Sequence, residues 1–316
     1  MFRARSSALL ALAACGSSGS STSAAPRIGS ALAATITAAD RDRVPWRCSG
    51  TRELAADEKL AGDWELAGGA LKRTKGELVI GVVADAGGSD PKTIAALGRL
   101  HGKLESEKAT LVIALGGMGA TQPELEATLA ALAGTWPVVA VPGDLEPVSA
   151  EVAAVAALRA RGVLVLDGRG VRTIEGPGAT IGVIPGAGSE ARLVAGADGC
   201  AWTADDVSAL YRELAALPGL RIAASAEAPR ELAGGEPTGE LALVPADAQP
   251  IDLLLHGPTR PAPTPERHGG RDGAHVGLSP GTADATTRLP QTPDPAGGLL
   301  VIRAGAWTWR PLVDSR

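Results

Sequence analysis

Four short apolar runs, each ending in a tight polar or glycine turn, constrain this chain more than any other feature. They are Leu78–Asp85, Leu111–Gly117, Val138–Glu146 and Ile251–Arg260, and a polar segment follows at Ser279–Arg288. An apolar run without polar interruption is typical of a strand that is buried on both faces, as in a parallel sheet covered by helices. The runs therefore predict an α/β domain with polar and glycine residues at the ends of its strands.

Helical patterns separate the first three runs. Ser89-Asp90-Pro91 supplies a cap residue and a first-turn proline, and apolar residues then recur at helical spacing as far as Leu104. Further helices are expected at Thr121–Leu132 and Ser149–Arg161. Strand and helix thus alternate, which predicts a sheet that begins parallel with right-handed crossovers.

The second half of the chain is richer in strands. One helix is expected at Thr203–Leu217, with Thr203 as its cap, and loops rich in proline and glycine are expected at Ala226–Pro250 and Pro258–Arg271. Asp57–Leu71 stays open between a short helix and an extended lead-in. The strands expected here, of which the last two form a hairpin, are Val163–Leu166, Val171–Glu175, Thr180–Ile184, Leu220–Ser225, Ile251–His256, Ala274–Leu278, Leu299–Arg303 and Ala306–Arg310.

The order and spacing of the five segments resemble the calcineurin-like metallophosphoesterases. In that family the turns read D-x-H, G-D, G-N-H-[DE] and G-H-x-H and hold two metal ions. The Ser279–Ala283 segment (SPGTA) is similar to the N-P-G-S stretch of the family. The resemblance covers about Glu77 to Leu312. It implies an α/β fold, a two-sheet β-sandwich flanked by helices (αββα); the alternative is another doubly wound α/β domain.

The family's metal ligands are almost all replaced in this chain. Asp85 stands at the aspartate of the first motif, Asp144 at the asparagine of the third, and Glu146 keeps the acidic end of the third. Two carboxylates cannot form the usual two-metal clamp, so no cofactor is expected. The weak alternative is a single divalent ion on Asp85 and Asp144 among waters. The positions that lose their metal donor, read from the resemblance, hold Gly87, Gly117, Leu145, Ala226, Pro258 and Arg260.

Arg260 suggests a replacement of charge. Removal of the cations from a partly buried acidic cleft leaves carboxylates unpaired, which is costly, and a guanidinium can supply the missing charge. We therefore predict an ion pair from Arg260 to Asp85 or Asp144, against the alternative that Arg260 is solvated on its loop. A further possibility is a small anionic ligand bound through Arg230, Arg260 and Arg267.

The N-terminus carries a processing signal. A basic pair, a short apolar stretch and Leu12-Ala13-Ala14-Cys15 resemble the lipobox of bacterial lipoproteins, with an ordinary secretory signal as the alternative. The resemblance implies a signal peptide at 1–14 and acyl chains, palmitate among them, on Cys15. A flexible tether is expected at 15–40, a lead-in at 41–76 and the domain at 77–316. Gly16 favours an outer-membrane destination by resemblance.

Two cysteines remain after such processing. An oxidising compartment favours a disulfide between Cys48 and Cys200, against two separate thiols. The net charge of −5 argues against a nucleic-acid partner.

Taken together, the residues predict a lipid-anchored envelope protein with a non-catalytic metallophosphoesterase-like domain. Its role would be in binding or scaffolding, with an envelope partner that the sequence does not name. The alternative is a phosphoester hydrolase with a reduced one-metal site on Asp85, Asp144 and Glu146.

Overall fold

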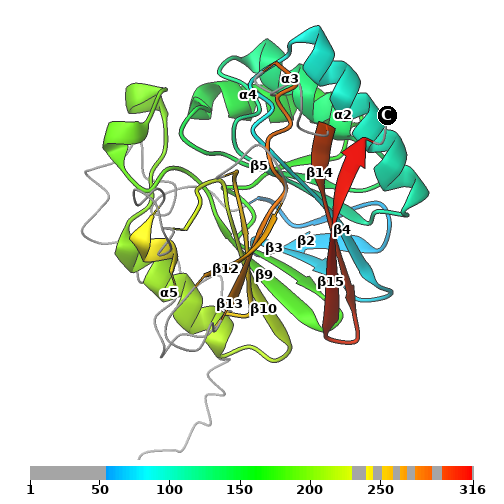
Figure 1. Ribbon diagram of the computed structural model, residues 1–316, viewed down its shortest axis with the longest axis vertical. Helices are drawn as coiled ribbons and strands as arrows, with labels where there is room; N and C mark the ends of the chain where they lie inside the picture. Colours follow the sequence, from blue (N-terminus) through cyan, green and yellow to red (C-terminus); the bar gives the residue numbers. More distant parts are fainter. Residues whose placement is uncertain are drawn as a thin grey trace, which may run out of the picture.

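The computed structural model describes residues 55–229, 240–244, 251–258, 264–268, 275–286 and 294–314. Within them two β-sheets pack face to face, and helices cover the outer face of each sheet (Figure 1). This arrangement is the two-sheet, helix-flanked sandwich that the sequence predicts, so the predicted fold class is confirmed.

The smaller sheet has six strands in the order β15-β14-β4-β5-β6-β7. The neighbours from β4 to β7 are parallel, whereas β14 runs antiparallel to β4 and forms the expected hairpin with β15. The strands are β4 (Leu78–Ala84), β5 (Leu111–Leu115), β6 (Val138–Val141), β7 (Val165–Asp167), β14 (Asp294–Arg303) and β15 (Ala306–Asp314).

The larger sheet has nine strands in the order β1-β2-β3-β8-β9-β10-β11-β13-β12. Its central neighbours β9, β10, β11 and β13 are parallel. The strands are β1 (Glu58–Lys59), β2 (Trp64–Ala67), β3 (Ala70–Arg73), β8 (Thr173–Gly176), β9 (Ala179–Ile184), β10 (Leu220–Ser225), β11 (Leu253–His256), β12 (Thr264–His268) and β13 (His275–Ser279).

Three of the helices, α2, α3 and α5, begin directly after a polar cap residue, whereas α4 begins one residue before the expected Ser149, after Pro147. Asp90 accepts a hydrogen bond from the Lys92 amide at the start of α2, and Thr121 and Thr203 form capping boxes with Glu124 and Asp206. The helices are α2 (Pro91–Ser106), α3 (Gln122–Leu132), α4 (Val148–Ala160) and α5 (Ala204–Ala215), with 3₁₀ turns η1 (Glu190–Arg192), η2 (Gly196–Asp198) and η3 (Leu241–Leu243).

Strand β4 shows why its sequence is apolar at every position. Leu78, Ile80 and Val82 point into the core between the two sheets, while Val79 and Val83 point into the core under the helices. Both faces of the strand are therefore removed from water, and alternation with polar residues would bury unpaired polar groups.

The structure corrects two loops expected from the sequence. Thr264–His268 lies inside the expected loop Pro258–Arg271, yet it forms β12 and pairs antiparallel with β13. Proline at position 265 suggested a loop, but β12 is an edge strand, where a missing N–H does not interrupt a ladder. The expected loop Ala226–Pro250 likewise contains η3.

The segment left open at Asp57–Leu71 is extended. It supplies β1, β2 and the start of β3, and β3 pairs parallel with β8. Trp64 is buried in the core between the sheets, and its indole N–H donates to the Thr110 carbonyl. This part of the predicted lead-in therefore belongs to the larger sheet.

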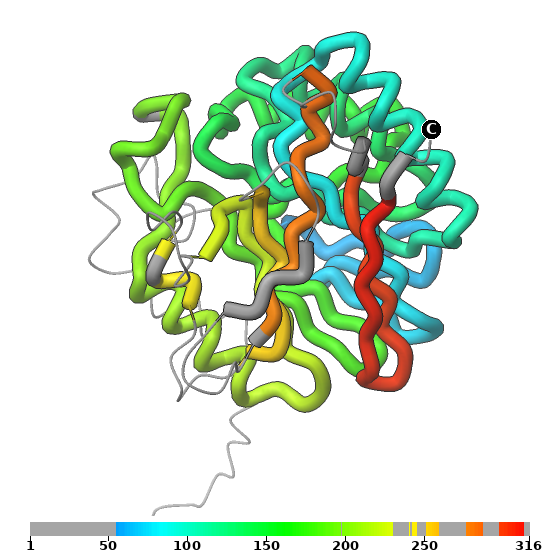
Figure 2. Tube along the Cα trace, viewed as in Figure 1, coloured from blue at the N-terminus to red at the C-terminus, as the bar shows by residue number. Residues whose placement is uncertain are grey.

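The stretch after β13 connects the two sheets. It leaves the larger sheet and runs to the end of β4, drawn orange in Figure 2. The amides of Ala283 and Asp284 donate to the carbonyls of Ala84 and Asp85 at 2.9 and 2.8 Å. The segment that resembles the family's N-P-G-S stretch thus lies against the first motif.

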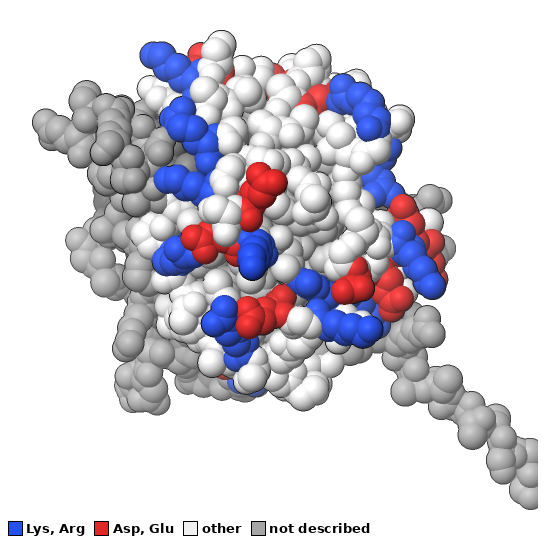
Figure 3. Space-filling view, turned by 90° about the vertical axis from the view of Figure 1, so that its right-hand side faces the viewer, with Lys and Arg blue, Asp and Glu red and all other residues white. Residues whose placement is uncertain are grey.

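Charged side chains of both signs lie next to one another on the face drawn in Figure 3. Surface ion pairs of the domain include Arg303 with Glu77 and Arg310 with Glu107. Such exposed pairs contribute little to stability, about 0–1 kcal/mol each. Among the helices of the described ranges, none is long and apolar enough to cross a bilayer.

Candidate functional site

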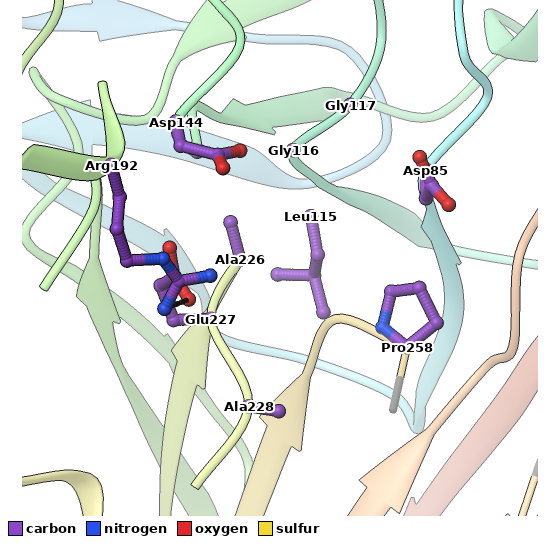
Figure 4. Close-up of a pocket in the computed structure, with 11 residues that line it drawn as sticks. Asp85, Leu115, Gly116, Gly117, Asp144, Arg192, Ala226, Glu227, Ala228 and Pro258 are labelled. Carbon is purple, nitrogen blue, oxygen red and sulfur yellow. Dashed lines mark ion pairs between the residues drawn. The ribbon is translucent and has the colours of Figure 1, made fainter. Parts of the chain in front are cut away.

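A pocket of ≈ 320 Å³ lies at the carboxyl ends of strands from both sheets. This end of a parallel sheet is where α/β proteins bind ligands, because the turns that follow neighbouring strands meet there. Figure 4 shows the lining residues, most of which lie at the ends of β4, β5 and β6 on one side and of β10 and β11 on the other, with Arg192 in η1 after β9. They are Asp85, Leu115, Gly116, Gly117, Gly143, Asp144, Arg192, Ala226, Glu227, Ala228 and Pro258.

Asp85 is held at one side of the pocket. Its backbone has φ = 51°, a left-handed conformation that is uncommon for a residue other than glycine. The Thr282 hydroxyl lies 2.9 Å from Asp85 Oδ2 and 2.8 Å from its carbonyl oxygen. Burial raises the pKa of Asp85, the hydrogen bond from Thr282 opposes this, and the charges of Asp284 and Asp144 raise the pKa further.

Asp144 lies on the opposite side, after β6 (Figure 4). Its side chain is half-buried and makes no hydrogen bond or ion pair with another residue of the described ranges. Its carbonyl oxygen accepts from the amide of Val194 at 2.9 Å. The two carboxylates that the resemblance selects therefore line one pocket, although they belong to turns nearly sixty residues apart.

Glu146 lies behind the turns and does not line the pocket. Its carboxylate is 2% exposed and accepts from the Met118 amide at 2.6 Å and the Gly143 amide at 2.8 Å. Burial raises the pKa of Glu146, while these amide hydrogen bonds oppose the change. Glu146 joins the turn after β5 to the turn after β6, which is a structural role.

The family's ligand positions are closed by packing as well as by composition. A β-carbon on Gly117 would lie 2.6 Å from the Cα of Asp85, and one on Gly87 would lie 2.9 Å from Asp284 Oδ2. Gly116 packs against Ala226, because a β-carbon there would be 2.7 Å from Ala226 Cβ. Real β-carbons do not approach other atoms so closely, so the neighbouring turns occupy the space that larger side chains would need.

Among the residues that the structure describes, Arg192 is the cation that lines this pocket, and the sequence did not single it out. Its Nη1 lies 2.7 Å from Glu227 Oε2 and 2.9 Å from Glu240 Oε1, and Figure 4 shows the first contact. Burial lowers the pKa of Arg192, but the charge of Glu227 and the contact with Glu240 outweigh it and raise the pKa overall. Nothing local distinguishes Arg192 in sequence, since a single arginine in a glycine-rich loop carries no motif.

Glu227 is the partner of Arg192 and follows Ala226 at the end of β10. Its side chain is 6% exposed. Burial raises the pKa of Glu227 to about 7, although the neighbouring Arg192 acts to lower it. The sequence selected Ala226 as a position that lacks the family's metal donor, and the carboxylate one residue further on was not considered.

Several predicted residues stand elsewhere. Arg260, Arg230, Cys15 and Cys48 lie outside the described residues, so the predicted ion pair of Arg260 stays a prediction. Cys200 is buried and disulfide-bonded, while the pairing with Cys48 stays a prediction. His256 is fully buried, with Nδ1 2.8 Å from the Gly257 carbonyl, in keeping with a structural role.

The residues present do not fit the two-metal site of the family. Pro258 and Ala226 line the pocket without a donor atom, and the Gly117 position has no room for a bridging carboxylate beside Asp85. Across the described ranges, no three side chains of His, Cys, Asp or Glu are grouped as metal ligands would be. A geometry with one bridging carboxylate and several nitrogen donors cannot be built from this set.

Comparison with known proteins supports the fold. No protein-family model and no curated protein matches the chain. Its solved structural neighbours include TT1561 of Thermus thermophilus, with a TM-score of 0.50, 14% identity, and coverage of 75% of this chain and 99% of that one. GAP50, the anchor in the inner membrane complex of Plasmodium, has a TM-score of 0.50, 10% identity, and coverage of 76% and 85%.

A dimetal phosphatase from Danio rerio is more distant, with a TM-score of 0.46, 8% identity, and coverage of 75% and 99%. At these identities the likeness concerns the fold alone. The chain is therefore similar in fold to TT1561 and GAP50.

Proposed function

We propose that this chain is an envelope lipoprotein whose metallophosphoesterase-like domain does not hydrolyse phosphoesters and acts in binding or scaffolding. The observation that carries the proposal is the contact between the turns after β4 and β5. A β-carbon on Gly117 would meet the Cα of Asp85 at 2.6 Å, so the position of the bridging carboxylate is occupied by backbone. A backbone cannot be moved aside as the end of a flexible side chain can.

The remaining chemistry of the pocket also favours binding over catalysis. Asp85, Asp144 and Glu227 supply carboxylates, and Arg192 supplies a cation that two glutamates already hold. Phosphoester hydrolysis at such a site needs a positive centre that is free to neutralise the transferring phosphoryl oxygens. A neighbour of the same fold is itself described as an anchor, so the fold is compatible with a role other than catalysis.

One assay separates this proposal from the one-metal hydrolase. The full chain, carrying Cys15→Ser so that it stays unlipidated, is purified, and its content of Mn, Fe, Zn and Mg is measured. Hydrolysis of p-nitrophenyl phosphate and bis-p-nitrophenyl phosphate is then followed with added Mn²⁺. We expect substoichiometric metal, and no turnover above that of Asp85→Asn.

The matched control is Asp205→Asn, which removes an exposed aspartate on α5. Stoichiometric metal together with turnover that Asp85→Asn abolishes and Asp205→Asn preserves would establish the hydrolase and refute the proposal.

The envelope location is tested separately. Cells that express the chain are labelled with palmitate and fractionated. We expect label and membrane association in the wild type and in Cys48→Ser, and neither in Cys15→Ser, because several acyl chains on one residue anchor a protein stably. Equal fractionation of the wild type and Cys15→Ser would contradict the lipid anchor.

A further inference from the structure

We infer that Arg192 is the internal counter-ion of this pocket and the residue that fastens segment 189–199 across the ends of the two sheets. The inference concerns charge and packing, and it holds whether or not the domain hydrolyses phosphoesters.

The position of segment 189–199 is the first support. It follows β9 of the larger sheet and carries η1 and η2. The amide of Val194 donates to the Asp144 carbonyl, and Asp198 accepts from the Ser149 amide at 3.1 Å, so the segment is tied to the loops around α4 of the smaller sheet. Arg192 then reaches back to Glu227 at the end of β10. The guanidinium therefore completes a bridge between the two halves of the sandwich.

The charge balance is the second support. Among the described residues that line the pocket, Arg192 is the one cation, and its guanidinium lies beside Glu227 while Asp85 lies across the pocket (Figure 4). Glu227 is 6% exposed, so its negative charge is costly to bury without a partner. The planar guanidinium can form ion pairs with Glu227 and Glu240 together. A metal ion or a lysine ammonium would contact the two carboxylates with a different geometry.

The chemistry of the residues that line the pocket is the third support. Because no metal set fits the pocket, the carboxylates that line it need a cation from the chain itself. The sequence predicted such a role for Arg260, which lies outside the described residues, so that prediction stays untested. Arg192 makes the predicted kind of contact from a different element, with two carboxylates that belong to neither of the family's aspartate positions.

The test is a double-mutant cycle in the full chain, with thermal denaturation at pH 8 as the readout. Arg192→Gln is expected to lower Tm by roughly 4–8 °C, because it leaves a buried glutamate without its cation. Adding Glu227→Gln is expected to recover more than half of that loss, since the uncompensated charge is then removed. This recovery is specific to a charge partner, because a residue that only fills space would not be rescued by a neutral neighbour.

Arg161→Gln is the matched control. Arg161 is also bound to a glutamate at 2.7 Å, but its side chain is 56% exposed against 43% for Arg192, and its partner Glu126 is more exposed than Glu227. Its loss of Tm is expected to be about 2 °C or less.

The inference is wrong if Arg192→Gln loses no more than Arg161→Gln, or if the losses of Arg192→Gln and Glu227→Gln simply add. If Arg192→Gln does not accumulate, Arg192→Lys decides the matter. It keeps the charge and should fold with a Tm within about 4 °C of the wild type. Failure of Arg192→Lys to fold as well would refute the role of charge.

Discussion

The Cα of Asp85 lies 2.6 Å from the point that a β-carbon on Gly117 would occupy. The turn after β4 thus occupies the space into which a side chain at position 117 would project. A carboxylate at this position would fit only if the two turns separated.

Gly117→Ala tests this contact. Gly117 has φ = 67°, so any substitution carries a backbone cost of roughly 1 kcal/mol. The collision with Asp85 should add about 1–3 kcal/mol in the free energy of unfolding, measured in urea. Gly162→Ala is the control, because Gly162 has φ = 78° and nothing within 4 Å of its would-be β-carbon. Equal losses in the two variants would mean that the turns are free to separate.

Glu146→Ala should be among the most destabilising single changes in the site. It removes the acceptor of two buried backbone amides, those of Met118 and Gly143, and the cost is expected to be roughly 3–5 kcal/mol. Glu105→Ala, an exposed change on α2, should cost less than about 0.5 kcal/mol by the same urea measurement. A loss below about 1 kcal/mol for Glu146→Ala would show that water replaces the carboxylate.

Thr282→Val removes the hydroxyl that binds Asp85. The shape of the side chain is kept, so the expected loss of about 1–2 kcal/mol reports the hydrogen bonds. The pKa of Asp85 should rise further, because the Thr282 contact opposes the effect of burial. An NMR titration of the Asp85 carboxyl carbon measures this rise. Thr308→Val, at an exposed position on β15, should change neither quantity, and an unchanged Asp85 titration in Thr282→Val would contradict the assignment.

Stability should fall with rising pH through Glu213 on α5. Burial raises the pKa of Glu213 to about 7, with Arg172 and Arg212 acting against the shift. Because the folded pKa exceeds the unfolded value of 4.5, the contribution of Glu213 is fully present below that value and is lost as pH approaches and passes 7.

The comparison variant is Glu213→Gln, which cannot titrate. Its free energy of unfolding relative to the wild type should rise by roughly 1–3 kcal/mol between pH 5 and pH 8. A constant difference between Glu213→Gln and the wild type across this range would indicate that Glu213 is charged in the fold at pH 5 already.

Local elements of the fold could be predicted because their causes are local. The apolar run of β4 needs both of its faces covered, and Thr121 and Thr203 cap helices through their own neighbours. Strand β12 could not be predicted, because its stability comes from pairing with β13 and its own residues favour a loop.

The candidate site was predicted in part. Asp85 and Asp144 do line one pocket, as their motif positions imply. Glu146, also predicted as a site candidate, accepts two backbone amides behind the pocket, and the sequence does not distinguish such a position from one that faces the pocket. Arg192 was not considered, since its partner Glu227 lies more than thirty residues further along the chain.

The sequence by itself determined the buried strands, the capped helices and the residues without a donor side chain at positions such as Gly87 and Pro258. Tertiary structure alone decided what lies beside these positions. Asp284 fills the space beside Gly87 from a segment almost two hundred residues away, and Arg192 supplies the cation from a turn without a motif. The sequence of a segment shows which donor atoms its side chains carry. The residue that packs beside such a segment is fixed by contacts between distant parts of the chain, and no local pattern encodes these contacts.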